Sequence, residues 1–130
     1  MKKLTLIFIL LFSTVMFSSP SFAKWTSVGK DMKGNTYYVD FDRIRKHDGY
    51  VYFWDMTDNL IPRDSILSAS SYMQGDCKLF RTKNLSFSFY KQPMGRGPAN
   101  VMKPVKEVQG WRYPLPNTAS EIILKSVCSH

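Results

Sequence analysis

Histidine and cysteine are scarce in this chain, which contains two of each among 130 residues. An enzyme site needs a nucleophile, a base and groups that stabilise developing charge, and histidine is the usual base. His130 is the last residue, and His47 lies in a charged segment where a solvated side chain is the simpler interpretation. Neither histidine has the spacing to other donors that is typical of a metal site. The sequence therefore predicts a protein that is not an enzyme.

Two further patterns fall short of a catalytic or cofactor site. Asp40, Asp42 and Asp48 lie close together in the sequence, as paired catalytic carboxylates do, but basic neighbours such as Arg43 make surface ion pairs the simpler account. Residues 95–97 read Gly-Arg-Gly, and no helix follows as a phosphate-binding loop requires. We therefore assign no catalytic, cofactor-binding or metal-binding residue.

Long apolar runs are absent apart from residues 4–17. Two lysines precede this run, and small residues follow it at Ser21 and Ala23. This order is typical of a secretory signal peptide over residues 1–23, cleaved between Ala23 and Lys24. The run of 14 residues is shorter than the roughly 20 that a membrane-spanning helix needs, although an uncleaved N-terminal anchor is the alternative.

The expected mature chain, residues 24–130, has 107 residues and is long enough for one domain. No cysteine lies at or directly after the expected cleavage point, where a lipid anchor would be attached, so the sequence predicts a protein free in the periplasm, outside the cell or at its surface. The formal charge of +8 becomes about +6 without the two leader lysines. Such a charge favours anionic partners, and export argues against nucleic acid as the partner.

Cys77 and Cys128 are the only cysteines. An even number of cysteines in an exported chain predicts a disulfide, and here one intramolecular pairing exists. The bridge would close a loop of 51 positions and stabilise the fold by about 4 kcal/mol in the chain-entropy model. Two free thiols, or thiols paired between molecules, are the alternative.

Alternating apolar and polar residues predict an antiparallel sheet in the first half of the mature chain. Trp25–Val28 and Thr36–Asp40 form a hairpin, and 41–49 form a helical turn. Large apolar groups occupy both faces of the strand 50–58, which is typical of a central strand. The segment 59–64 contains a proline and is expected to end it.

The second half continues this pattern. Residues 65–76 form a strand, 78–82 and 85–90 form two more around a tight turn at 83–84, and 101–108 form an edge strand. The stretch 78–90 also interleaves aromatic and basic residues, as proteins that bind single-stranded nucleic acid do. Its alternation, however, places Leu85, Phe87 and Phe89 together on one face, which favours a core strand with a solvated cationic edge.

A C-terminal helix completes the predicted fold. Thr118 and Glu121 fit a capping box, and the apolar positions that follow form one stripe: Ile122, Ile123, Val127 and Cys128. The predicted class is α+β, an antiparallel sheet with this helix packed on one face. The disulfide would tether the helix to the sheet.

One helix covers only one face of a sheet, yet the strand 50–58 is aromatic on both faces. Tyr50, Tyr52 and Trp54 share a face that is left for a partner, a ligand or self-association. The alternative is that the long loop 91–116 folds over them.

The mature chain resembles the surface-adhesin protein E family of exported Gram-negative proteins. The resemblance runs from about residue 24 to residue 128 and rests on the order of these segments: KWTSVG, TYYVD, RIRK, YFWDMTD, GDCKLFRT, LSFSFY, MGRG, GWRYPLPNTASE and the closing VC. It implies an antiparallel sheet of about six strands with a C-terminal helix tethered by a disulfide. It also implies binding of host matrix or serum proteins, dimerisation and haemin binding. The family's lipid-anchored adhesin differs in having an acylation cysteine.

The sequence therefore predicts an exported binding protein that recognises another protein through basic edges and an aromatic face. The candidate partner-binding residues are Tyr50, Tyr52, Trp54, Lys78, Arg81, Lys83 and Arg96. A periplasmic protein that binds a small molecule or haem, with His47 as the ligand, is one alternative. An inhibitor of an envelope enzyme is another, and a homodimer is compatible with each.

Overall fold

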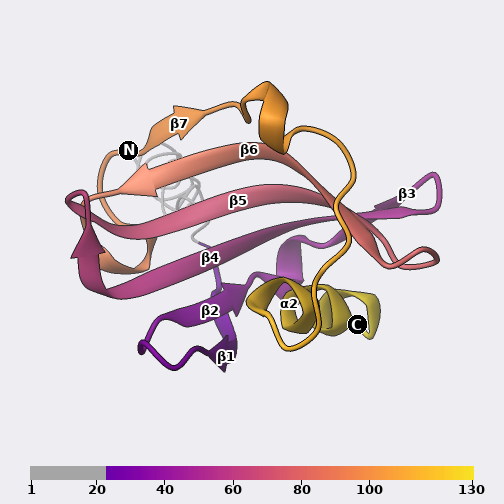
Figure 1. Cartoon of the computed structure of the whole chain (residues 1–130), viewed down its shortest axis with the longest axis horizontal. Helices are drawn as coiled ribbons and strands as arrows, with labels where there is room; N and C mark the ends of the chain where they lie inside the picture. Colours follow the sequence, from indigo (N-terminus) through magenta and orange to yellow (C-terminus); the bar gives the residue numbers. More distant parts are fainter. Residues whose placement is uncertain (1–22) are drawn as a thin grey trace, which may run out of the picture.

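The computed structural model describes residues 23–130, so nearly all of the expected signal peptide lies outside the described residues. The described chain forms one seven-stranded antiparallel sheet and a C-terminal helix, which confirms the α+β prediction (Figure 1). The strands are β1 (Thr26–Lys30), β2 (Thr36–Val39), β3 (Arg45–His47), β4 (Tyr50–Arg63), β5 (Ile66–Asp76), β6 (Arg81–Tyr90) and β7 (Asn100–Met102). Three 3₁₀ turns, η1 (Phe41–Arg43), η2 (Pro93–Gly95) and η3 (Lys106–Val108), and the helix α2 (Ala119–Cys128) complete the fold.

The long hairpin of β4 and β5 is the centre of the sheet. The strand order is β1-β2-β4-β5-β6-β7, and β3 also pairs with β4. β2 pairs with the later part of β4, whereas β3 pairs with its beginning. Directly opposed residues in antiparallel strands point to the same face, so the register assigns each side chain to one of two faces.

One face carries the hydrophobic core under α2. The helix begins at Thr118, whose hydroxyl oxygen accepts a hydrogen bond from the Glu121 amide, as the predicted capping box requires. The core consists of Val39, Val51 and Phe53 from the strands and Ile123, Leu124 and Val127 from the helix. The Cys77–Cys128 disulfide, with an S–S distance of 2.06 Å, ties the end of the helix to the turn after β5 and confirms the predicted pairing.

Gly75 lets the helix approach the sheet closely. A Cβ atom at this position would lie 2.8 Å from Val51 Cγ2 and 3.1 Å from Leu124 Cδ1. Any larger residue would therefore push the helix and the sheet apart.

Two predicted breaks in the strands were wrong. β4 continues through 59–64 as far as Arg63, and the chain reverses at Asp64 and Ser65, both of which have positive φ. Pro62 is tolerated because the ladder between β4 and β5 is interrupted between Asp58 and Arg63. β6 runs without a break through 83–84, which pair with β5 in place of the expected turn, and the register shifts just after them, between Asn84 and Ser86.

The other two differences concern short elements. The segment 41–49 begins with the expected helical turn, η1, but Arg45–His47 then form the strand β3. The predicted edge strand 101–108 is only three residues long, because η3 follows it after Pro104.

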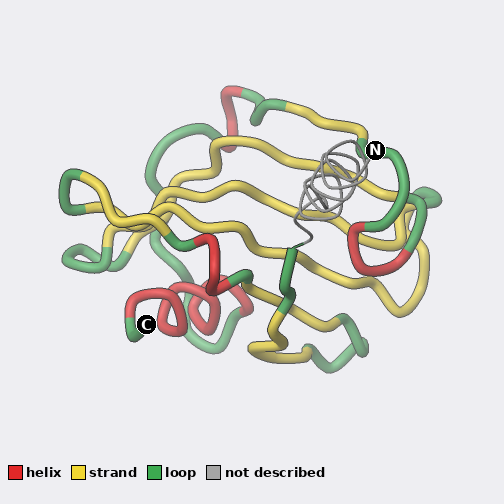
Figure 2. Tube along the Cα trace, turned by 180° about the vertical axis from the view of Figure 1, so that it is seen from behind, coloured by secondary structure: helices red, strands yellow, loops and turns green. Residues whose placement is uncertain are grey.

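The loop 91–116 covers only part of the second face. Its segment η2 lies across one end of this face, which Figure 2 shows from behind. Ser68 fixes it, since the Ser68 hydroxyl donates to the Gln92 carbonyl over 2.6 Å and accepts from the Gly95 amide over 2.8 Å. Met56 is fully buried there, and a Cβ at Gly95 would lie 3.4 Å from its sulfur. The remainder of the face is the candidate site.

Candidate protein-recognition face

Five aromatic side chains gather on the second face beyond η2, and the loop 91–116 itself contributes one of them. Tyr50, Tyr52 and Trp54 alternate with the core residues of β4, so they point away from α2. Tyr72 of β5 is opposite Trp54, and their ring centroids are 4.8 Å apart. The Tyr72 ring also stacks on Tyr52 at 6.3 Å. With Trp111 from the loop before α2, these residues form what we call the aromatic row: Tyr50, Tyr52, Trp54, Tyr72 and Trp111.

Trp111 is placed by a backbone contact far away in the sequence. Arg112 and Thr82 exchange two backbone hydrogen bonds of 2.8 and 2.9 Å at the start of β6. This bridge holds the Trp111 ring 5.4 Å from the Tyr50 ring. The Arg81 guanidinium and the Lys83 ammonium lie 4.3 and 4.7 Å from the centroid of the same indole. Both are within the range of a cation–π interaction.

Asp76 orients Arg81 beneath Trp111. The Arg81 Nε donates to the Asp76 carboxylate over 2.9 Å, and Asp76 is only 5% exposed. The carboxylate also accepts hydrogen bonds from the Leu79 and Lys78 amides. The Leu79 amide is the largest cause that holds the pKa of Asp76 below its ordinary value, and Arg81 acts in the same direction. The Arg81 side chain is therefore fixed in position by Asp76.

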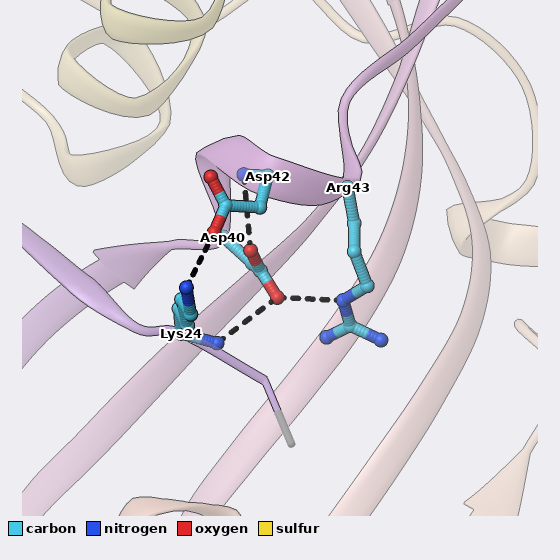
Figure 3. A network of polar contacts seen from close by, with 4 residues as sticks. All are labelled: Lys24, Asp40, Asp42 and Arg43. Carbon is cyan, nitrogen blue, oxygen red and sulfur yellow. Dashed lines mark hydrogen bonds and ion pairs between the residues drawn. The ribbon is translucent and has the colours of Figure 1, made fainter. Parts of the chain in front are cut away.

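A second cation is held at the other end of the row. The Arg43 guanidinium carbon lies 5.2 Å from the Trp54 ring centroid and 5.7 Å from that of Trp25. Its Nε donates to Asp40 over 2.6 Å, and Asp40 is 1% exposed (Figure 3). A buried carboxylate thus fixes an arginine between two indole rings.

The strand β3 adds further positive charge to this side. Arg45 is directly opposite Tyr52 in the ladder and is exposed. A surface cavity of about 550 Å³ lies between them, lined by Arg45, Lys46, His47, Tyr52 and Tyr72. The aromatic row therefore runs between two pairs of cations, Arg43 and Arg45 on one side and Arg81 and Lys83 on the other.

The structure brings together five of the seven sequence-predicted candidates: Tyr50, Tyr52, Trp54, Arg81 and Lys83. Lys78 lies in the exposed turn after β5, and Arg96 lies in the exposed loop beside η2, at the far end of the face. In the described part of the chain, the cation–π contacts with the row come from Arg43, Arg81 and Lys83 and not from these two residues. Their part in binding, like that of the other five, stays a prediction.

Sequence reasoning missed Arg43, Tyr72 and Trp111. The alternation of β5 gave a signal for Tyr72, since Ser70, Tyr72 and Gln74 share a face. Arg43 and Trp111 reach the row through long-range contacts that no local pattern encodes.

His47, the candidate haem ligand, lies on the exposed strand β3 with its Nε2 3.0 Å from the Asp48 carboxylate. In residues 23–130, no group of three or more His, Cys, Asp or Glu side chains is arranged to hold a metal ion. Haem binding through His47 stays a prediction, and loss of a Soret shift in His47→Ala would test it.

A separate cavity of about 460 Å³ lies on the helix side of the sheet, between the start of α2 and the loop before it. Asp55 and Asn84 contribute to its lining, and Asn84 Oδ1 is a buried acceptor without a hydrogen-bond partner among residues 23–130. Burial raises the pKa of the Asp55 carboxyl to about 7, although hydrogen bonds from Ser71 favour its charged form.

The fold and the site define a binding domain in which a disulfide-tethered helix covers one face of a sheet and the other presents aromatic and cationic side chains. The chain belongs to the surface-adhesin protein E family, whose model matches residues 25–129. This family is a class of surface adhesins and not a class of enzymes, and membership indicates an exported or cell-surface location. Across the described part of the chain, no helix has the length and hydrophobicity to cross a membrane.

Solved structures of Haemophilus influenzae protein E have the same fold. Crystal form II is 17% identical with a TM-score of 0.61, and the match covers 85% of this chain and 92% of that one. A second structure of this protein is 17% identical with a TM-score of 0.60, covering 86% and 90%. Protein E from a non-typeable strain is 16% identical with a TM-score of 0.55, covering 85% and 80%. A comparison with curated proteins found no match.

Proposed function

We propose that the mature protein is an exported adhesin that binds an acidic segment of a host matrix or serum protein across the aromatic row. One observation carries this proposal: five half-buried aromatic side chains lie together on the sheet face opposite the helix, between two pairs of cations. Aromatic and arginine side chains dominate the energetics of protein interfaces. The membership of a surface-adhesin family supports the same function.

The charge pattern favours an acidic partner. Asp76 and Asp40, the carboxylates next to the row, are buried and already paired with Arg81 and Arg43. Lys83 and Arg45 add positive charge on either side without such a carboxylate partner in the described residues. An acidic segment would therefore meet a complementary potential, and its binding should weaken as salt screens the charges.

The test is binding of the exported protein to immobilised matrix and serum proteins at about 50 and 300 mM NaCl, since the Debye length shortens over this range. We expect salt-sensitive binding that falls several-fold in Lys83→Ala. Lys125→Ala is the matched control, because it removes an exposed lysine from α2 on the opposite face. Equal binding by the two variants, or retention of all the protein inside the outer membrane, would refute the proposal.

A second candidate function is the binding of a small molecule on the helix side. The cavity beside Asp55 has a volume of about 460 Å³, which lies in the range of ligand sites. Its unpartnered Asn84 oxygen and its Asp55 carboxyl favour a ligand that donates hydrogen bonds. A ligand screen by thermal shift tests this candidate, and a ligand whose effect survives in Asp55→Asn does not use the cavity as described.

A further inference from the structure

The backbone nitrogen of Lys24 lies against a buried carboxylate. It donates to Asp40 Oδ2 over 3.2 Å, and Asp40 is 1% exposed. The same carboxylate accepts from the Asp42 amide over 3.1 Å and from Arg43 Nε over 2.6 Å (Figure 3). Lys24 is separated from Asp40 by the whole hairpin of β1 and β2, so this contact is not a local turn.

This nitrogen is also the atom that the expected signal-peptide cleavage would change. Water would hydrolyse the Ala23–Lys24 amide in the active site of an envelope peptidase. The hydroxyl would go to the Ala23 carbonyl carbon and the proton to the Lys24 nitrogen. The product of this step is a new α-amino group, which at neutral pH takes up a further proton while the new Ala23 carboxyl group releases one. An amide with one N–H would become an ammonium with three.

We propose that Asp40 is a built acceptor for the α-ammonium group of the mature protein, so that cleavage between Ala23 and Lys24 converts an amide hydrogen bond into an ion pair. The inference rests on the proposed export and on this cleavage point. A hydrogen bond between ionised partners is roughly twice as strong as a neutral one. A cut one residue earlier or later would place the new charge one residue away from the carboxylate.

The ion pair has a consequence for the aromatic row. Trp25 follows Lys24 directly, and its ring contacts the Arg43 guanidinium that Asp40 also holds. A docked terminus therefore fixes Trp25, Arg43 and, through Arg43, the Trp54 end of the row. These contacts already exist with the Ala23–Lys24 bond intact, so cleavage would strengthen this end of the candidate site rather than create it.

The experiment compares two exported proteins, the wild type and a variant with one glycine inserted between Ala23 and Lys24. The intact mass of each purified protein establishes its first residue. We expect the inserted glycine to lower the Tm by about 4–8 °C, the shift expected for the loss of a single moderate interaction in a domain of this size. In Asp40→Asn backgrounds the two proteins should have the same Tm.

If Asp40→Asn does not fold, the pH dependence of the difference in Tm tests the ion pair instead. An α-ammonium ordinarily loses its proton at about pH 7.7–8.0, and an ion pair delays this loss. The Tm of the wild type should therefore exceed that of the insertion variant by the full amount at pH 6.5, and this difference in Tm should be smaller at pH 9.5. The charged groups that face the terminus, Asp40, Asp42, Arg43 and Arg96, are common to both proteins.

The outcomes separate the two proposals. A mature protein that starts at another residue refutes the cleavage point, and a chain produced to start at Lys24 then still tests the docking. A wild type that starts at Lys24 but has the same Tm as the insertion variant, or a difference that persists without Asp40 or does not shrink with pH, overturns the docking.

Discussion

The two faces of the central strand β4 are built in opposite ways. Phe53 and Val51 point under the helix into a core that a disulfide closes, and Phe53 is fully buried. Tyr52 and Trp54, their neighbours in sequence, stay half-buried against the Tyr72 ring, and Arg43, which is anchored on the buried Asp40, also contacts Trp54. One face therefore provides stability and the other provides side chains for contact. Substitutions on the two faces should affect different measurements.

The largest effect on stability should come from removing the Cys77–Cys128 disulfide, which ties α2 to the sheet. Replacing Cys77 and Cys128 together with serine removes a cross-link with a sequence separation of 51. We expect the free energy of unfolding to fall by about 4 kcal/mol, because the unfolded chain gains loop entropy. Urea denaturation measures this change. A loss below about 1 kcal/mol would show that packing alone holds α2 against the sheet.

A smaller loss should follow from Gly75→Ala under the helix. The new Cβ would lie 2.8 Å from Val51 and 3.1 Å from Leu124, so the core must expand, at a cost of about 1–3 kcal/mol. Gly29→Ala is the control, since its Cβ would meet Ile122 at an ordinary 3.6 Å. Equal stabilities of the two variants would contradict the close approach of the helix.

Asp55→Asn should stabilise the protein at high pH. Because the pKa of Asp55 is raised to about 7, the folded state keeps a proton that the unfolded chain loses above about pH 4. The stability contributed by this group is therefore present below about pH 4 and lost as the pH rises to about 7. We expect Asp55→Asn to be more stable than the wild type at pH 8 and equally stable near pH 4. Thermal unfolding at both pH values checks this, and a gain that does not depend on pH would contradict the assignment.

The smallest effect on stability should come from the aromatic face. Arg45 is exposed and opposite Tyr52 on the short strand β3. Arg45→Ala should change the free energy of unfolding by less than about 0.5 kcal/mol, as surface substitutions do, while the rate of association with an acidic partner falls. A large loss of stability would mean that this side chain has a structural role.

Local patterns predicted the parts of the fold that depend on local chemistry. The Thr118 cap, the alternation of β4 and the cysteine pair were all visible in the sequence, and the structure confirms the helix, the central strand and the disulfide. β3 was missed because three consecutive polar residues carry no alternation, and only pairing with β4 makes them a strand. The continuation of β4 past Pro62 depends on an interruption in the ladder between β4 and β5, and no local sequence pattern predicts this interruption.

The same division applies to the candidate site. Tyr50, Tyr52 and Trp54 could be assigned to one face from their spacing alone. Trp111 reaches them only because Arg112 bridges to Thr82, and Arg43 only because the buried Asp40 holds it. These contacts join segments that are distant in sequence or depend on burial, so a structure was needed to find them.

One pair of variants tests the central claim, that the aromatic row is the surface that meets a partner. Trp111→Ala removes the indole between Arg81 and Lys83, and Ile122→Ala removes an exposed apolar side chain from the helix on the opposite face. For a matrix or serum protein that the wild type binds, we predict that Trp111→Ala weakens the Kd by at least about tenfold, as loss of a tryptophan at the centre of an interface does. Ile122→Ala should leave the Kd unchanged. An unchanged Kd in Trp111→Ala, with the loss found in Ile122→Ala, would contradict the account.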